Sequence, residues 1–247
     1  MSNFKIYAMI PARYGSTRLK FKNLALINGK PMISYAIEAA KESNCFDKII
    51  VNSEHTIFKE ISKRYEVDFY HRPNDLGSSN TKSDSVVADF MNYYSEADIV
   101  VWVNPISPFQ SGEEISDIAE FFIQNKLDSL ITVQNMQVHC NYNDSAVNYN
   151  IDGLFQKTQE LSPIQPFVYS VMMWRRESFL KEFIDKGHAL FCGNFGTYPV
   201  SKSSGIIIKN SDDLKLADLL MRSISSESDQ YLIEYDDLVN NFKDINL

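Results

Sequence analysis

Short apolar runs of strand length alternate with longer amphipathic segments over most of this chain of 247 residues. The apolar runs predict β-strands at residues 5–10, 47–51, 67–70, 98–103, 129–134 and 167–175. Segments with apolar side chains on one helical face predict helices at residues 31–43, 56–65, 85–94, 113–125 and 177–186. Regular alternation of strand and helix is typical of an α/β fold with a mostly parallel sheet and helices on both faces.

The alternation stops between residues 136 and 166, a segment rich in Asn, Tyr and Gln in which residues 150–153 have the composition of a hairpin turn. Farther on, the apolar run at residues 205–209 predicts a last strand. The chain length suits one domain, so we expect a single domain over residues 1–247 with an insertion at about residues 136–175. Aromatic residues in or beside this insertion either cover the chain's own sheet or form a subunit interface, which we favour: Tyr142, Tyr149, Phe155, Phe167 and Tyr169.

The loop after the first predicted strand carries four basic side chains within ten residues, Arg13, Arg18, Lys20 and Lys22. Gly15 and Ser16 allow backbone N–H groups to approach an anion closely. A strand, a polar loop and a helix in this order collect phosphates at the C-terminal edge of an open α/β sheet. The sequence therefore predicts a triphosphate site, although the loop is neither a Walker loop nor a Gly-x-Gly-x-x-Gly loop.

Two later loops also follow predicted strands. Residues 71–83 contain Arg72, whose guanidinium suits a second anion contact, and they lead into a predicted helix. Residues 104–110 begin with Asn104 and form a rigid turn with two prolines. Because parallel strands end at the same edge of a sheet, we expect both loops beside the basic loop.

Charge and composition narrow the class of partner. The formal net charge of −8 argues against nucleic acid, because binding a phosphate backbone needs a basic face. The basic loop stands out against this acidic chain, as expected of a site for a small anion. There is no apolar run of about 18 residues and no signal-peptide composition, so we expect a cytoplasmic protein without membrane association. The three cysteines form no metal or disulfide pattern.

The sequence from Ile10 to Asn23 resembles the signature of the cytidylyltransferases that activate 2-keto sugar acids. These are the acylneuraminate (CMP-sialic acid) synthetases and their 3-deoxy-manno-octulosonate relatives. The match covers Ile-Pro-Ala-Arg at 10–13, Gly-Ser at 15–16, Lys-Asn at 22–23 and Gly-Lys-Pro at 29–31, while Thr17 replaces a basic residue and Lys20 a proline. Two further family elements are matched by Arg72, Pro73 and Leu76, and by Pro105, Ser107 and Pro108.

The resemblance implies a Rossmann-like nucleotidyltransferase fold of the GT-A-like type, and a homodimer in which the insertion reaches the partner's sugar site. It implies transfer of CMP from CTP to a 2-keto sugar acid of the sialic-acid type, with release of pyrophosphate. Arg13 and Lys22 then hold the phosphates as catalytic residues, and Gln159 contacts the sugar acid. The implied nucleotide-binding residues are Arg13, Gly15, Ser16, Arg18, Lys22, Asn23, Arg72, Ser83 and Asn104. His71 and His139 are candidates for the general base, although a lone histidine is more often a surface residue.

The last predicted strand departs from the family where its members hold divalent cations. Ile207 and Lys209 stand where relatives have two aspartates, and neither side chain can ligate a hard cation. Asp212 and Asp213 fit better as first-turn residues of a following helix. We therefore predict no protein metal site, with Mg²⁺ carried in only by CTP.

Three interpretations of this departure remain open. The ammonium of Lys209 replaces a cation, a metal is held by substrate phosphates and another carboxylate, or the chain keeps the fold without the chemistry. The last interpretation makes a non-catalytic nucleotide- or sugar-binding relative the main alternative to an enzyme. A cytidylyltransferase for a different acceptor, such as a phosphonate, is a further alternative, and Gln110 in place of a family arginine leaves the acceptor's charge open.

Overall fold

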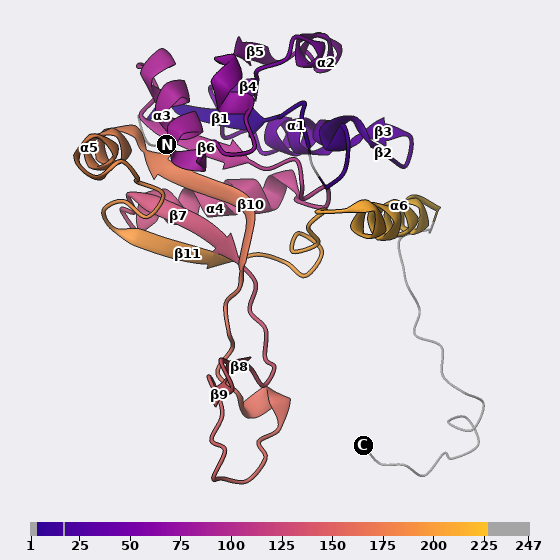
Figure 1. Ribbon diagram of the computed structural model, residues 1–247, viewed down its shortest axis with the longest axis vertical. Coiled ribbons are helices and arrows are strands. Elements are labelled where there is room, and N and C mark those ends of the chain that lie inside the picture. Colours follow the sequence, from indigo (N-terminus) through magenta and orange to yellow (C-terminus); the bar gives the residue numbers. More distant parts are fainter. Residues whose placement is uncertain (1–3, 17, 227–247) are drawn as a thin grey trace.

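The computed structural model describes residues 4–16 and 18–226 and contains a seven-stranded sheet (Figure 1). The order across the sheet is β11-β7-β10-β6-β1-β4-β5. The strands are β1 (Ile6–Pro11), β4 (Lys48–Ser53), β5 (Asp68–His71), β6 (Ile99–Val103), β7 (Ser129–Val133), β10 (Phe167–Arg175) and β11 (Phe195–Pro199). Only β10 in this sheet is antiparallel to its neighbours, β6 and β7. The predicted α/β fold with a mostly parallel sheet is confirmed.

Helices cover both faces of the sheet, as predicted. They are α1 (Met32–Glu42), α2 (Ile57–Tyr65), α3 (Ser83–Tyr93), α4 (Gly112–Gln124), α5 (Arg176–Lys186) and α6 (Ser211–Ser226). Apolar residues of α1, α2 and α4 share one core cluster with one face of the sheet, and those of α3 and α5 share a second cluster with the other face. The alternation of side chains along β1 explains this division, because Ala8 and Ile10 enter the first cluster while Tyr7 and Met9 enter the second.

A small hairpin follows the basic loop and supports α6 at the side of the sheet. It joins β2 (Leu26–Ile27) to β3 (Lys30–Pro31) through Asn28 and Gly29, both at positive φ as a two-residue hairpin turn requires. The backbone N–H of Asn28 donates to Asp218 Oδ1 at 2.7 Å, and Ile27 packs in a third core cluster with Ala217. Thus α6 is fixed against the segment that continues the basic loop.

The prediction of a last strand at residues 205–209 is wrong. The seventh strand is β11, which pairs with β7, and residues 205–209 form no strand. Ile208 is buried beneath α6 with Ile27 and Ala217, and its N–H donates to Ile106 O at 2.9 Å. The apolar run therefore reflects packing under α6 rather than pairing in the sheet.

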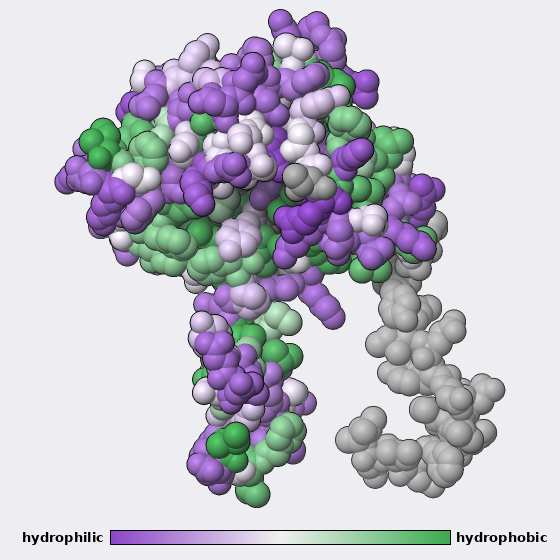
Figure 2. Space-filling model, in the orientation of Figure 1, coloured by the Kyte–Doolittle hydropathy of each residue, from purple (hydrophilic) through white to green (hydrophobic). Residues whose placement is uncertain are grey.

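The irregular segment predicted as an insertion projects from the body as an arm, which we define as residues 135–165 (Figure 1). It carries the short strands β8 (Asn141–Tyr142) and β9 (Ser145–Ala146), which pair with each other. An isolated antiparallel bridge between Met136 and Ile164 joins the first and last segments of the arm. Residues 167–175 belong to β10 inside the sheet, so the arm is shorter than the predicted range of 136–175. Figure 2 shows apolar and polar residues mixed along the arm.

No helix in the described part of the chain is long and apolar enough to cross a membrane.

Candidate functional site

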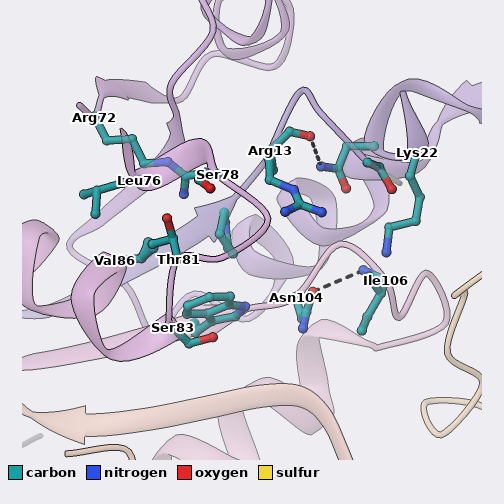
Figure 3. A pocket seen from close by; sticks show the side chains of 14 residues that line it. Arg13, Lys22, Arg72, Leu76, Ser78, Thr81, Ser83, Val86, Asn104 and Ile106 are labelled. Carbon is teal, nitrogen blue, oxygen red and sulfur yellow. Dashed lines mark hydrogen bonds between the residues drawn. The ribbon is translucent and has the colours of Figure 1, made fainter. Parts of the chain in front are cut away.

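A pocket of about 240 Å³ opens where β1 and β6 end, at the C-terminal edge of the sheet (Figure 3). This is the edge at which open α/β sheets bind ligands. The ends of β1 and β6 contribute to the pocket, together with the basic loop and its 3-10 turn η1 (Lys22–Leu24). The loop containing η2 (Asn74–Gly77) and the first turn of α3 complete it. The lining residues are Pro11, Arg13, Ser16, Lys22, Asn23, Arg72, Leu76, Ser78, Thr81, Ser83, Val86, Trp102, Asn104 and Ile106.

Arg13 and Lys22 project into the same space from the two sides of the basic loop (Figure 3). Asn23 is buried and its Nδ2 donates to Arg13 O at 3.2 Å, which closes the loop on itself. The ammonium of Lys22 lies 3.4 Å from Ile208 O. Within residues 4–16 and 18–226, neither Arg13 nor Lys22 forms an ion pair. Both positive charges are therefore available to an anionic ligand.

In the free protein, the environment of Lys22 disfavours the charged form of its side chain. Burial, followed by the charges of Arg18 and Arg13, lowers the pKa of Lys22 to about 8. Asp213 acts in the opposite direction. A bound polyphosphate would favour the charged ammonium and raise this pKa again.

If CTP, which the resemblance implies, is the ligand of this pocket, its binding should take up a proton above about pH 8. Lys22 is charged in the free protein below that pH and largely neutral above it, whereas the complex keeps the charge. CTP affinity should therefore stay level up to about pH 8 and fall as the pH rises further. Calorimetry in buffers of different ionisation enthalpy measures the proton uptake. Lys22→Arg, which stays charged, should abolish it; uptake that persists in this variant would contradict the assignment.

Arg72 is held by an ion pair rather than left free for the ligand. Its side chain is 3% exposed, and Nη2 donates to Glu54 Oε2 at 2.8 Å. Glu54 Oε1 accepts the backbone N–H of Tyr14 at 2.8 Å, so one carboxylate joins the basic loop to the Arg72 loop. A Cβ at Gly77 would lie 2.4 Å from Glu54 Cγ, so this close approach requires glycine. Arg72 lines the pocket, and its Nε is buried without a hydrogen-bond partner among the described residues.

Ser83 and Asn104 reach the pocket from α3 and from the turn after β6. Ser83 is the first residue of α3, so the N-terminus of that helix faces the pocket and favours negative charge there. The side-chain amide of Asn104 bonds to two neighbouring backbone groups: Nδ2 donates to Tyr169 O at 3.0 Å, and Oδ1 accepts from Ile106 N at 3.4 Å. Tyr169 adopts a φ of 59° within an irregularity of β10, a strained conformation for an aromatic residue beside the site.

The remaining predicted site residues do not line the pocket. Gly15 and Arg18 are exposed on the basic loop, and Thr17 between them lies outside the described residues. Gln159 is exposed on the arm, in the 3-10 turn η3 (Thr158–Glu160). The two histidines lie elsewhere too: His71 Nε2 is 2.9 Å from Glu54 O, and His139 stacks on Phe155 in the arm.

Comparison with known proteins decides the family. The family model described as cytidylyltransferase matches residues 7–181, which include the basic loop, the Arg72 loop and the turn after β6. The chain belongs to the cytidylyltransferase family.

Cytidylyltransferases with related sequences carry several names. An N-acylneuraminate cytidylyltransferase of Streptococcus agalactiae is 26% identical over 217 residues, which are 85% of this chain and 51% of that protein. A 3-deoxy-manno-octulosonate cytidylyltransferase of Bdellovibrio bacteriovorus is 26% identical over 202 residues, 75% of this chain and 80% of that protein. A CMP-N,N'-diacetyllegionaminic acid synthase of Legionella pneumophila is 32% identical over 121 residues, 47% of this chain and 52% of that protein. The chain spans about half the length of the curated N-acylneuraminate cytidylyltransferase from Streptococcus.

Two solved structures share the fold of this chain. A CMP:2-keto-3-deoxy-manno-octonic acid synthetase complexed with CTP superposes with a TM-score of 0.67 at 17% identity, covering 89% of this chain and 99% of that one. The 4-diphosphocytidyl-2C-methyl-D-erythritol synthase of Anaerococcus prevotii has a TM-score of 0.61 at 14% identity, and the match covers 90% of this chain and 100% of that one.

The side chains of Ile207 and Lys209, which precede α6, do not fit a divalent cation. Ile207 offers no ligand atom, and Lys209 is exposed and lies outside the pocket lining. Asp213 Oδ2 accepts the N–H groups of Lys209 and Asn210 at 2.7 and 3.0 Å, so it serves the start of α6 as predicted. No group of three or more His, Cys, Asp or Glu side chains suited to a metal occurs within residues 4–16 and 18–226.

Glu54 and Trp102 are site residues that the sequence analysis did not single out. Glu54 directly follows β4, and a charged residue after a strand was the available signal. Trp102 lies inside the apolar run of β6, where nothing distinguishes a pocket-lining residue from a core residue.

Proposed function

We propose that this chain transfers CMP from CTP to a 2-keto sugar acid of the sialic-acid type and releases pyrophosphate. The observation that carries the proposal is the pair of cations, Arg13 and Lys22, which form no ion pair with another described residue and line a pocket at the C-terminal edge of the sheet in an otherwise acidic chain. Family membership supports the cytidylyl group as the group transferred, and the names of the relatives support a sugar acid as the acceptor.

The proposed reaction is an in-line displacement at the α-phosphorus of CTP. The anomeric hydroxyl oxygen of the sugar acid forms a bond to that phosphorus as the bond from the phosphorus to the bridging oxygen of the β-phosphate breaks. Pyrophosphate leaves with the electron pair, and the proton of the hydroxyl passes to water. Arg13 and Lys22 would hold the phosphates and offset the charge that builds on the leaving group. Binding restores the ammonium of Lys22, so its charge is present when the leaving group needs it.

A pyrophosphate-release screen tests the proposal. CTP, UTP, ATP and GTP would each be incubated with a panel of 2-keto sugar acids, with and without a divalent metal. We expect release with CTP and an eight- or nine-carbon acid, and only weak dependence on added Mg²⁺, because the side chains of Ile207 and Lys209 offer no ligand atom to a divalent cation. Absence of release with every pair would refute the enzyme.

A non-catalytic nucleotide-binding protein is the second candidate function. Ile207 and Lys209, in place of the family's two aspartates, favour it. CTP binding without turnover, with or without Mg²⁺ or Mn²⁺, would support this candidate, whereas steady pyrophosphate release would end it.

A different acceptor remains the alternative within the enzyme class. Gln110, which stands where the family has an arginine, is buried and donates from Nε2 to Glu114 Oε2 at 2.6 Å. It therefore offers no cation to an acidic acceptor. Phosphonates and unusual sugar acids belong in the acceptor panel for this reason.

We further propose that the chain forms a homodimer through the arm. Leu154 and Phe155 are 93% and 85% exposed, and Tyr142 and Ile151 are each 73% exposed, which is unusual for large apolar side chains. A dimer would bury this surface, and aromatic residues are enriched in interface cores.

Light scattering at micromolar concentration should give twice the mass of one chain, and Leu154→Asp with Phe155→Asp should shift it toward the monomer. Ile184→Asp, at an exposed apolar residue of α5, is the matched control and should leave the mass unchanged. A monomer mass for the unaltered protein would refute the dimer.

A further inference from the structure

Trp102 lines the pocket and has no role in the proposed chemistry. It lies on β6 opposite Met9 of β1 and Met172 of β10, and its ring packs against the core cluster beneath α3. Its indole Nε1 is buried without a hydrogen-bond partner among the described residues, while the side chain lines the pocket. A buried N–H without an acceptor is costly, so a ligand that supplies the acceptor gains that energy on binding.

The two ends of the pocket differ in chemistry, and this locates the acceptor. Arg13 and Lys22 lie toward one end, whereas Thr81 and Val86 lie toward the other, where the charge of Arg72 is already paired with Glu54 (Figure 3). Phosphate oxygens are drawn to Arg13 and Lys22, which form no ion pair with another described residue. The nucleoside then occupies the end lined by the first turn of α3, and Trp102 packs with α3 residues in the same cluster.

The indole N–H can only donate a hydrogen bond, so the ligand atom that it contacts must be an acceptor. Hydroxyl groups such as those of Thr81 and Ser83 can donate or accept, so they discriminate less. The other pocket-lining side-chain atom that is buried and unpaired in the described part of the chain, Arg72 Nε, is also a donor. The pocket therefore offers donors to a ligand rich in oxygen acceptors.

We propose that Trp102 is a specificity-determining residue whose indole N–H donates to an oxygen of the nucleoside, a ribose hydroxyl or the base carbonyl. This inference rests on the proposed function, because it assumes that CTP occupies the pocket. It adds a contact to the nucleoside, distinct from the cations that hold the triphosphate.

Calorimetry with Trp102→Phe tests the inference, because phenylalanine keeps an aromatic ring and removes the donor. CTP should bind about fivefold to tenfold more weakly, the effect of one lost hydrogen bond. Inorganic tripolyphosphate, which lacks a nucleoside, should bind as it does to the unaltered protein. Tyr93→Phe, at an exposed residue on α3 outside the pocket, should change neither affinity.

Titration with 2'-deoxy-CTP identifies the acceptor. If the penalty of Trp102→Phe disappears with this ligand, the acceptor is the ribose 2'-hydroxyl. If the penalty persists, the acceptor is another nucleoside oxygen. Unchanged CTP affinity in Trp102→Phe, or an equal loss with tripolyphosphate, would overturn the inference.

Intrinsic fluorescence gives a test that needs no variant. The chain has two tryptophans, and Trp174 is fully buried with Nε1 bonded to Leu190 O at 2.9 Å. Saturation with CTP should therefore change the emission through Trp102, and unchanged emission would overturn the inference. Pyrophosphate release with an unaffected Trp102→Phe variant would overturn this inference alone, whereas failure of the unaltered protein to bind CTP would overturn the proposed function as well.

Discussion

Replacing Glu54 with alanine is expected to lower the free energy of unfolding by about 3–5 kcal/mol, the largest effect that we predict for a single substitution. The substitution leaves the guanidinium of Arg72, 3% exposed, without its counter-ion. It also removes the acceptor of Tyr14 N–H, so the basic loop and the Arg72 loop lose their common tether. Urea denaturation followed by circular dichroism measures the loss.

Two further variants make this test specific. Glu38→Ala breaks an exposed ion pair with Lys30 at 3.0 Å and should cost no more than about 1 kcal/mol. Replacing Arg72 and Glu54 together with methionine removes both buried charges and should recover much of the stability lost in Glu54→Ala. Equal losses for Glu54→Ala and Glu38→Ala would show that the buried pair does not tie the loops together.

Replacing Lys22 or Arg13 with alanine is expected to weaken CTP binding by about 1–3 kcal/mol each, the range for a lost hydrogen bond to a charged group. Unlike Glu54→Ala, neither change should lower the stability of the free protein much, because neither cation forms an ion pair with another described residue and Lys22 loses only its 3.4 Å hydrogen bond to Ile208 O. Arg13→Ala also removes one of the positive charges that, after burial, lower the pKa of Lys22. At both positions the affinity for CTP is thus expected to fall while the stability stays nearly unchanged.

Calorimetric titration with CTP, paired with urea denaturation, measures both effects. Lys20→Ala is the matched control, since Lys20 is an exposed cation of the same loop outside the pocket lining. Lys20→Ala should change the free energy of CTP binding by less than about 1 kcal/mol, because solvent and salt screen the charge of Lys20. If both Lys22→Ala and Arg13→Ala bind CTP like the unaltered protein, the triphosphate site lies elsewhere.

The sheet was predictable where its strands are buried on both faces. The runs that became β1 and β6 are almost wholly apolar, and only a central parallel strand requires that pattern. Strand β11 was missed because Phe195–Pro199 lies at the sheet edge, is only partly buried, and contains Gly and Pro, which disfavour strands. Residues 205–209 show the converse error, since apolar residues that pack under a helix look like a strand in sequence.

The candidate site was predictable where a short motif supplies a run of charges. Arg13 and Lys22 stand in the basic loop, and the topology brings Ser83 and Asn104 to the same edge. The role of Arg72 was not predictable, because its partner Glu54 is 18 residues away in sequence. Gln159 was placed by resemblance alone, and it lies on the arm rather than in this pocket.

A crystal structure of the chain with CTP tests the central claim most directly. The account predicts the triphosphate between Arg13 and Lys22 Nζ, the nucleoside against the first turn of α3 with an oxygen within hydrogen-bond distance of Trp102 Nε1, and no metal ligand from residues 205–213. Triphosphate density away from Arg13 and Lys22, or a divalent cation coordinated by oxygen atoms of residues 205–213, would contradict it.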